Sequence, residues 1–274
     1  MQHPLAAKWT GSGEHFGFMN QPNAGFANFA VLVESLMPII DANQNDVNEI
    51  RDEILSKGQS VFADAVDDAI RTKLGLIGGA SDTAKEAIEL WEEIEMLLRD
   101  ARADWTLFWR QLTYVAHKYS PAKSEMGDSH WSDFDGMIST LLGEGNTYPF
   151  YDTLSDKNRI VLRAWIEKWH KALTSCYQYA ARNSVDVTPP EEIMRVANPK
   201  YTLKEWMLVD AYTKADSRTS KGNPFHVSGD YSGVHELFEL CKDPYGEGSA
   251  ENHNKYYRRA PDEALQAGGT AFMS

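Results

Sequence analysis

The sequence predicts a mainly α, multi-helix protein, and three observations support this prediction. Apolar residues recur three and four positions apart through most of the chain, which is the spacing of a helix with one buried face. Two capping boxes, Thr83 with Glu86 and Thr202 with Glu205, mark helix starts. The chain has 274 residues and is 42% hydrophobic, so it can bury a core as one large domain or two small ones.

The first apolar segment follows a glycine-rich loop at residues 9–19. Gln21 and Pro22 are typical of a turn or helix entry, and apolar residues at helical spacing follow as far as Ile40. We expect one buried helix that pins the loop against a core. The loop spacing, G-x-G-x-x-x-G, is one residue too long for a dinucleotide fingerprint, and no Lys-Ser/Thr follows it as in a phosphate loop. The loop is therefore interpreted as structural.

Further helices are expected at regular intervals after this segment. In chain order they are predicted at 47–74, 84–98, 104–112, 131–142, 154–181, 189–198, 203–214 and 234–240. The first could equally be two helices joined near Gly58, and Gly75, Gly78 and Gly79 should end it. Glycine and proline interrupt residues 120–151, which are expected to be rich in loops.

Composition excludes several classes of function. The chain has 40 acidic and 27 basic residues, and its net charge of -13 argues against nucleic acid or anionic membranes as partners. No run of about 18 apolar residues is present, so no membrane span is expected, and no targeting signal is visible at the N-terminus. Cys176 and Cys241 are interpreted as ordinary buried or half-buried thiols.

Metal-binding patterns are incomplete. Asp133 and Asp135 lack the third acidic ligand and the closing glutamate of a calcium loop, so Asp133 is interpreted as a capped helix start. His235 and Glu236 are not a zinc-protease motif, because residue 239 is glutamate instead of a second histidine. A metal hydrolase is therefore disfavoured.

Short motifs in several places resemble, in the same order, those of the selenoprotein O (SelO) family. They are an aromatic-x-x-Gln-Pro-x-x-Gly-x-x-Asn run, a Lys-Leu-Gly-Leu element at 73–76 followed by D-[WF]-T-x-x-[FW]-R, an M-x-x-x-N-P turn before a helix, and a [DN]-P-[YF] element. The matching positions, called the signature residues below, are Phe18, Gln21, Pro22, Gly25, Asn28, Asp104, Arg110, Asn198, Pro199, Pro244 and Tyr245.

The resemblance implies a protein-kinase-like fold and an activity. Members of the family are protein adenylyltransferases, which use ATP and Mg to move AMP onto hydroxyl groups of protein substrates. In the family these motifs follow the catalytic core, so this chain is expected to be a C-terminal portion whose partner is the missing N-terminal kinase-like part. The family's catalytic and metal-binding residues precede Gln21. No catalytic, cofactor-binding or metal-binding residue can be carried over, so we expect the chain to bind neither ATP nor Mg and to be inactive alone.

The same resemblance suggests how the chain is divided. Residues 1–118 would be the end of the kinase-like C-lobe with helical hairpins, 119–151 a loop-rich connection, and 152–274 a C-terminal helical region with an irregular tail. It implies a mitochondrial location in a eukaryote and a cytoplasmic one otherwise. From the residues alone, a free-standing all-α protein-interaction module with 120–151 as its binding face is the alternative.

Overall fold

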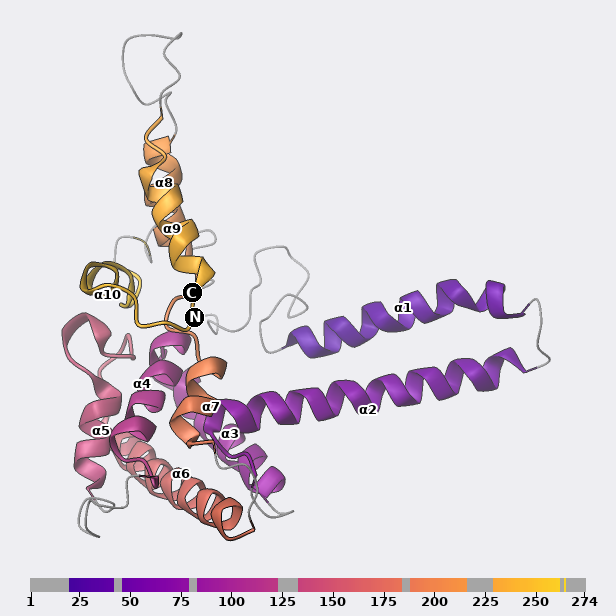
Figure 1. The fold of residues 1–274 in the computed structure, drawn as a ribbon, viewed down its shortest axis with the longest axis horizontal. Coiled ribbons are helices and arrows are strands. Elements are labelled where there is room, and N and C mark those ends of the chain that lie inside the picture. The colour runs from indigo at the N-terminus through magenta and orange to yellow at the C-terminus, as the bar shows by residue number, and fades with distance from the viewer. Residues whose placement is uncertain are drawn as a thin grey trace. The chain divides into compact units, whose positions relative to one another are not determined.

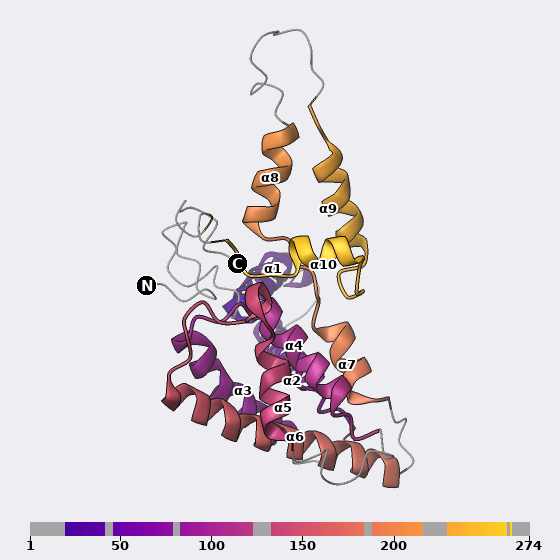
Figure 2. The same ribbon diagram turned by 90° about the vertical axis from the view of Figure 1, so that its left-hand side faces the viewer.

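The computed structural model describes residues 20–41, 46–78, 83–122, 133–183, 188–215, 229–261 and 264. Within these ranges the chain is mainly α-helical, as predicted, with one isolated antiparallel bridge between Ala103 and Phe150 (Figures 1 and 2). The helices are α1 (Gln21–Asp41), α2 (Val47–Leu74), α3 (Thr83–Asp100), α4 (Trp105–Lys118), α5 (Phe134–Leu142), the short 3-10 helix η3 (Gly145–Thr147), α6 (Asp156–Arg182), α7 (Pro190–Ala197), α8 (Glu205–Ala215), α9 (Ser232–Lys242) and α10 (Ala250–Tyr256).

Contacts divide the chain into two compact units, Met1–Ile70 and Arg71–Ser274. The division falls near the end of α2. The stretches predicted from the sequence, 1–118, 119–151 and 152–274, have no boundary there.

In the first unit, α1 and α2 contact each other through aromatic rings. The ring centroid of Phe62 lies 5.8 Å from that of Phe26 and 6.3 Å from that of Phe29. Gly58 faces the Phe29 ring so closely that a Cβ there would collide with it. Glycine at this position is thus a contact point between helices, and α2 continues through it as one helix, which settles the alternative of two.

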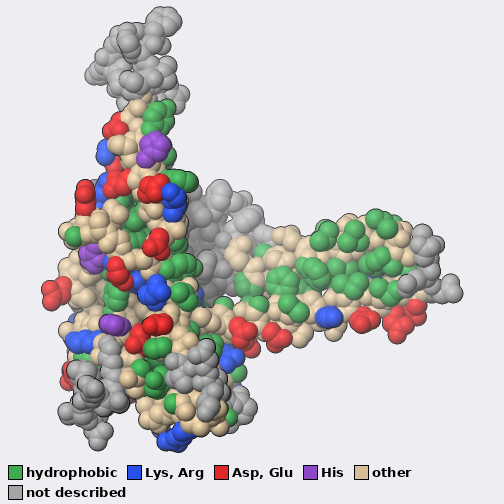
Figure 3. All heavy atoms as spheres, in the orientation of Figure 1, with side chains coloured by type: hydrophobic (Ala, Val, Ile, Leu, Met, Phe, Trp, Pro, Cys, Tyr) green, Lys and Arg blue, Asp and Glu red, His purple; other side chains and the backbone are tan. Residues whose placement is uncertain are grey.

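The prediction that α1 is buried is wrong for most of its apolar residues. Val31, Leu32, Leu36 and Ile39 are 44 to 70% exposed. A helix packed on one neighbour covers only a single stripe, and here that stripe includes Val33. Figure 3 shows hydrophobic side chains gathered along α1 and the adjoining part of α2.

By length and composition, Gln21–Ile40 could also cross a membrane, and 17% of its most apolar stretch is buried. The expectation of no membrane span rested on unbroken apolar runs, and this helix passes the broader test despite its polar interruptions. A core helix or a signal sequence passes the same test, so the result does not place α1 in a membrane.

The second unit is built around tryptophans from α3, α4 and α6. The rings of Trp91 and Trp109 stack with centroids 4.9 Å apart, and those of Trp165 and Trp169 stack at 6.2 Å. The indole Nε1 of Trp165 donates to the carbonyl of Leu90 at 2.8 Å, which joins α6 to α3. The apolar face predicted for α6 is confirmed, because its members are all buried.

A second apolar cluster joins α8, α9 and α10, and Figure 2 shows α8 and α9 side by side. Its buried members are Leu107, Tyr201, Met207, Ala211, Leu237, Leu240, Tyr256 and Tyr257. Helix α10 was not predicted, since the tail was expected to be irregular. Its start is capped by Ser249, whose side chain accepts from the backbone N–H of Asn252 at 3.0 Å.

Predictions about single residues were confirmed for a helix cap and a helix end, and for one of the two cysteines. Asp133 caps α5 by accepting from the N–H of Gly136 at 2.9 Å, as expected. Gly75 has a φ of 74° just past the end of α2, as a terminating glycine should. Cys176 is buried as expected, whereas Cys241 is exposed, because successive residues of a helix point in different directions and Leu240 takes the buried side of α9.

Candidate functional site

Signature residues that are far apart in the sequence meet in the second unit. Asp104, Arg110 and Asn198 are each 0% exposed, which is unusual for such polar side chains. Arg110 contacts the segments that contain Asn198 and Tyr245, and Asp104 lies at the start of the same helix. We call the polar contacts centred on Arg110 the Arg110 junction.

All five N–H groups of the Arg110 guanidinium have acceptors. Nε donates to the Tyr114 hydroxyl at 3.3 Å, and Nη2 donates to the carbonyl of Tyr245 at 3.0 Å and to Oε1 of Glu247 at 2.5 Å. Nη1 donates to the carbonyls of Arg195 at 3.3 Å and Asn198 at 3.0 Å. Because carbonyls at a helix C-terminus have no partner inside the helix, Arg110 both satisfies the end of α7 and ties it to α4.

Asn198 connects the same region to the end of α2. Its Nδ2 donates to the carbonyl of Lys73 at 3.0 Å and to Oγ1 of Thr113 at 3.2 Å, while its Oδ1 accepts from Nζ of Lys73 at 3.1 Å. Lys73 also donates to the carbonyl of Ala197 at 3.0 Å. The amide of asparagine supplies donors and an acceptor together, which a carboxylate could not do. Pro199 follows directly, where α7 has ended.

Glu247 is the principal anion of the junction. Its Oε2 accepts from Nζ of Lys200 and from the hydroxyl of Tyr114, both at 2.8 Å, in addition to the contact of Oε1 with Arg110. Burial opposes ionisation of Glu247, but hydrogen bonds from Lys200, Tyr114 and Arg110 outweigh it and lower the pKa to about 2. Burial also raises the pKa of Tyr114 to about 12, so this phenol stays protonated and can donate.

Asp104 forms a separate buried ion pair at the start of α4. Its Oδ1 accepts from the backbone N–H of Leu107 at 3.1 Å, the usual contact of a helix cap. Its Oδ2 accepts from Nζ of Lys204, and the two side chains are 1% and 6% exposed. The cap therefore also attaches α4 to the segment that leads into α8.

The remaining signature residues have other places. Phe18 lies outside the described residues. Gln21, Pro22, Gly25 and Asn28 belong to α1 in the first unit, where a Cβ on Gly25 would lie 3.2 Å from the Phe62 ring. The carbonyl of Pro244 accepts from the backbone N–H of Lys200 at 2.8 Å and of Tyr201 at 3.1 Å.

Sequence reasoning missed Glu247, Lys200, Tyr114 and Lys204. Glu247, Lys200 and Lys204 have partners 47 to 137 residues away in the chain, and Tyr114 contacts Glu247 from 133 residues away in addition to Arg110 four residues before it. Two local signals were available: the four-residue spacing of Arg110 and Tyr114 on one helix, and the sequence Gly246-Glu247-Gly248, which places a charged residue between two glycines directly after a signature motif.

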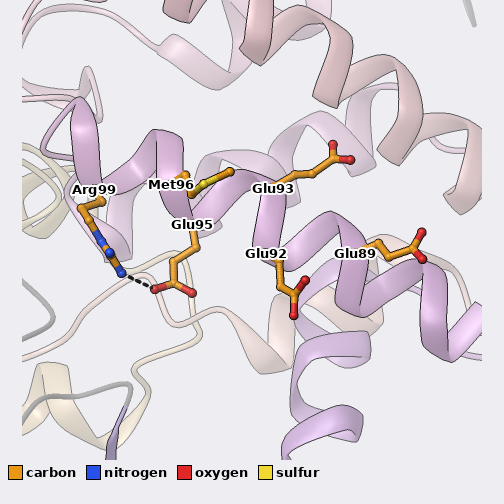
Figure 4. Close-up of a pocket in the computed structure, with 6 residues that line it drawn as sticks. All are labelled: Glu89, Glu92, Glu93, Glu95, Met96 and Arg99. Carbon is orange, nitrogen blue, oxygen red and sulfur yellow. Dashed lines mark hydrogen bonds and ion pairs between the residues drawn. The ribbon is translucent and has the colours of Figure 1, made fainter.

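A hollow of about 490 Å³ lies on α3, and Figure 4 shows its lining. All of the lining residues come from this one helix: Glu89, Glu92, Glu93, Glu95, Met96 and Arg99. Glu95 accepts from Arg99 at 3.0 Å, and Glu93 accepts from Lys168 of α6 at 2.8 Å. Within the described residues, no group of three or more His, Cys, Asp or Glu could hold a metal ion. We interpret the hollow as a solvated acidic helix face.

Because Lys73 is largely buried, we expect the free energy of unfolding to depend on pH. Burial lowers the pKa of its amine to about 8, from an ordinary value of 10.5. Between these values the unfolded chain binds a proton that the folded chain has lost, so stability rises with pH, by about 1 kcal/mol per pH unit. Urea unfolding should show this rise between about pH 8 and 9.5, below the range in which tyrosines titrate.

The comparison for this prediction is Lys73→Met, which retains the side-chain length without the amine. The rise should be absent from the variant. Equal slopes in the two proteins would show that Lys73 is not the group responsible.

The junction holds segments of the chain together through hydrogen bonds and ion pairs. Its charged groups are hydrogen-bonded to one another and to backbone carbonyls at the end of α7 and in residues 245–247. Fully satisfied buried networks of this kind fix a unique arrangement of chain segments.

Comparisons with a family model and with curated proteins identify the same family. A family model described as protein adenylyltransferase SelO matches residues 4–228. A relative named protein nucleotidyltransferase YdiU, from Xanthomonas oryzae pv. oryzae (strain MAFF 311018), is 26% identical over 96% of this chain and 41% of its own length. A YdiU relative from Pseudarthrobacter chlorophenolicus is 26% identical over 92% of this chain and 40% of its own length. The chain thus spans about two fifths of the length of these curated relatives.

Proposed function

The chain belongs to the protein adenylyltransferase SelO family, and from this membership we propose that it forms the C-terminal portion of a SelO-like enzyme. Such an enzyme would transfer AMP from ATP to hydroxyl groups of protein substrates. The proposal rests on the difference in length between this chain and its relatives: 96% of this chain matches only 41% of the Xanthomonas oryzae relative. The ATP and Mg sites would lie in the preceding part, and the chain would be inactive without it.

Within that enzyme the chain would act as a brace for a kinase-like lobe. The Arg110 junction supports this role, because its buried cations hold backbone carbonyls of two segments, at the end of α7 and in the turn at 243–249, in fixed positions. The buried signature side chains Asp104, Arg110 and Asn198 all make hydrogen bonds within the chain. Their chemistry fits a structural task better than the binding of a nucleotide.

The exposed face of α1 would be covered by the preceding part of the enzyme. Val31, Leu32 and Ile39 are 69, 55 and 70% exposed. Burying apolar surface contributes about 25 cal/mol per Å², so covering these side chains would stabilise the joined protein.

A calorimetric titration tests the proposal. We expect the isolated chain to show no heat of binding with ATP and Mg and no incorporation of labelled AMP into protein. Joining the chain to the part of the Xanthomonas oryzae relative that precedes the matching region should allow AMP transfer. Micromolar binding of ATP and Mg to the isolated chain would contradict the proposal.

A free-standing all-α interaction module is the second candidate. It is favoured by exposed aromatic residues on and beside α8 and α9, namely Tyr212, Tyr231 and Phe238, which are 52 to 61% exposed. Genomic sequence decides between the two. An in-frame upstream region encoding a Gly-rich loop, a lysine and an Asp-Asn pair supports the enzyme, whereas a stop codon and promoter there support the module.

A further inference from the structure

The turn at residues 243–249 places one carboxylate over two buried cations. The side chains of Arg110 and Lys200 are 0% and 3% exposed, whereas that of Glu247 is 59% exposed. Nη2 of Arg110, Nζ of Lys200 and the Tyr114 hydroxyl converge on the two oxygens of Glu247. The donors therefore form a floor, and the carboxylate lies between this floor and solvent.

Charge within this group is unbalanced. Arg110 and Lys200 carry two positive charges, and Glu247 supplies one negative charge. Removing a cation from water is costly unless an anion or hydrogen-bond acceptors replace the water. Backbone carbonyls supply acceptors to both cations, and the carboxylate supplies the negative charge that offsets them.

We propose that Arg110, Lys200 and Tyr114 form an oxyanion-binding site, of the carboxylate or phosphate class, in which Glu247 is the resident ligand. An arginine fork, an ammonium and a phenol hydroxyl are donors that bind both classes of oxyanion. The three donors come from α4 and from the segment before α8, while the ligand comes from a different segment. Site and ligand are therefore separable parts of the chain.

The frame of the site does not depend on the Glu247 side chain. The carbonyl of Glu247 accepts from Nζ of Lys200 at 2.8 Å and from the Tyr201 hydroxyl at 2.9 Å. The carbonyl of Tyr245 accepts from Arg110 at 3.0 Å. Gly248 has a φ of 66° and would bring a Cβ within 2.7 Å of the Tyr201 hydroxyl, so glycine lets the turn lie this close. Truncating the carboxylate should leave the turn attached and the donors facing a space that is open to solvent and to added anions.

Chemical rescue tests the proposal. Thermal unfolding of wild type and Glu247→Ala would be measured in sodium formate, in sodium phosphate, and in sodium chloride of matched ionic strength. Glu247→Ala should melt several degrees below wild type in chloride, and formate or phosphate should restore much of that loss with saturation. Phosphate also stabilises folded proteins generally by exclusion from their surface, so rescue is the shift of Glu247→Ala in excess of the shift of wild type in the same salt. A larger shift with formate than phosphate would assign the site to carboxylates, and the reverse to phosphoryl groups.

Two controls keep the test decisive. Glu92→Ala removes one exposed glutamate from α3 with the same change of net charge, and it should behave like wild type. Glu247→Gln fills the space without a charge, so it should be destabilised but not rescued. If Glu247→Ala is unfolded in chloride, recovery of its helical circular dichroism in formate or phosphate supports the site. No rescue specific to these anions, or equal rescue of Glu92→Ala or Glu247→Gln, overturns the proposal.

Discussion

Replacing Arg110 by alanine is expected to lower the free energy of unfolding of the second unit by about 3–5 kcal/mol. The variant leaves the carbonyls of Arg195, Asn198 and Tyr245 without their donor and removes one of the cations facing Glu247. A buried acceptor that loses its partner costs more than the net value of the hydrogen bond, because water cannot replace the donor fully. Urea unfolding followed by tryptophan fluorescence measures the change.

Arg110→Lys separates charge from geometry. Lysine keeps the positive charge but has no planar fork with five donors, so it should recover only a minor part of the loss. The matched control is Arg163→Ala. Arg163 is 45% exposed and pairs with Asp135 and Glu167 at the surface, so its removal should cost less than about 1 kcal/mol. Equal effects of Arg110→Ala and Arg163→Ala would show that the junction contributes no more than a surface ion pair.

Local patterns in the sequence were sufficient for most helices. The apolar face of α6 has Leu162, Trp165, Ile166, Trp169 and Leu173 at helical spacing, and all are buried. Such spacing is a property of neighbouring residues, so it can be recognised without knowledge of the fold. The cap of α5 by Asp133 could be predicted for the same reason.

Features that depend on distant partners could not be predicted in this way. The apolar pattern of α1 indicated a helix but not what covers it, and Val31 and Ile39 proved exposed. Helix α10 has seven residues, too few for a clear apolar period, and its burial depends on packing against α8 and α9.

The candidate site was predicted in part. Resemblance to the SelO family selected Asp104, Arg110 and Asn198, and the structure buries all three. It did not select Glu247, whose carboxylate is the counter-ion of Arg110 from 137 residues away. Side chains that complete a buried network are determined by the folded arrangement, so local spacing carries no signal for them.

Asp104→Ala is expected to cost about 4 kcal/mol, since it removes a helix cap and leaves the Lys204 ammonium buried without its carboxylate. Asp104→Asn should cost less, because an asparagine side chain still accepts from the N–H of Leu107. Thermal or urea unfolding of each variant provides the measurement. A cost below about 1 kcal/mol for Asp104→Ala would mean that the cap alone, or neither interaction, contributes.

The double variant Asp104→Ala/Lys204→Met separates the two costs. Methionine fills the space of the lysine stem without a charge, so the uncompensated ammonium disappears and only the missing cap remains. We expect the double variant to be more stable than Asp104→Ala by about 2–3 kcal/mol, a coupling typical of residues in one buried pair. Additive effects of the two substitutions would contradict this explanation. Since Lys204 lies 100 residues from Asp104, strong coupling would show that the start of α4 and the approach to α8 are stabilised as one structure.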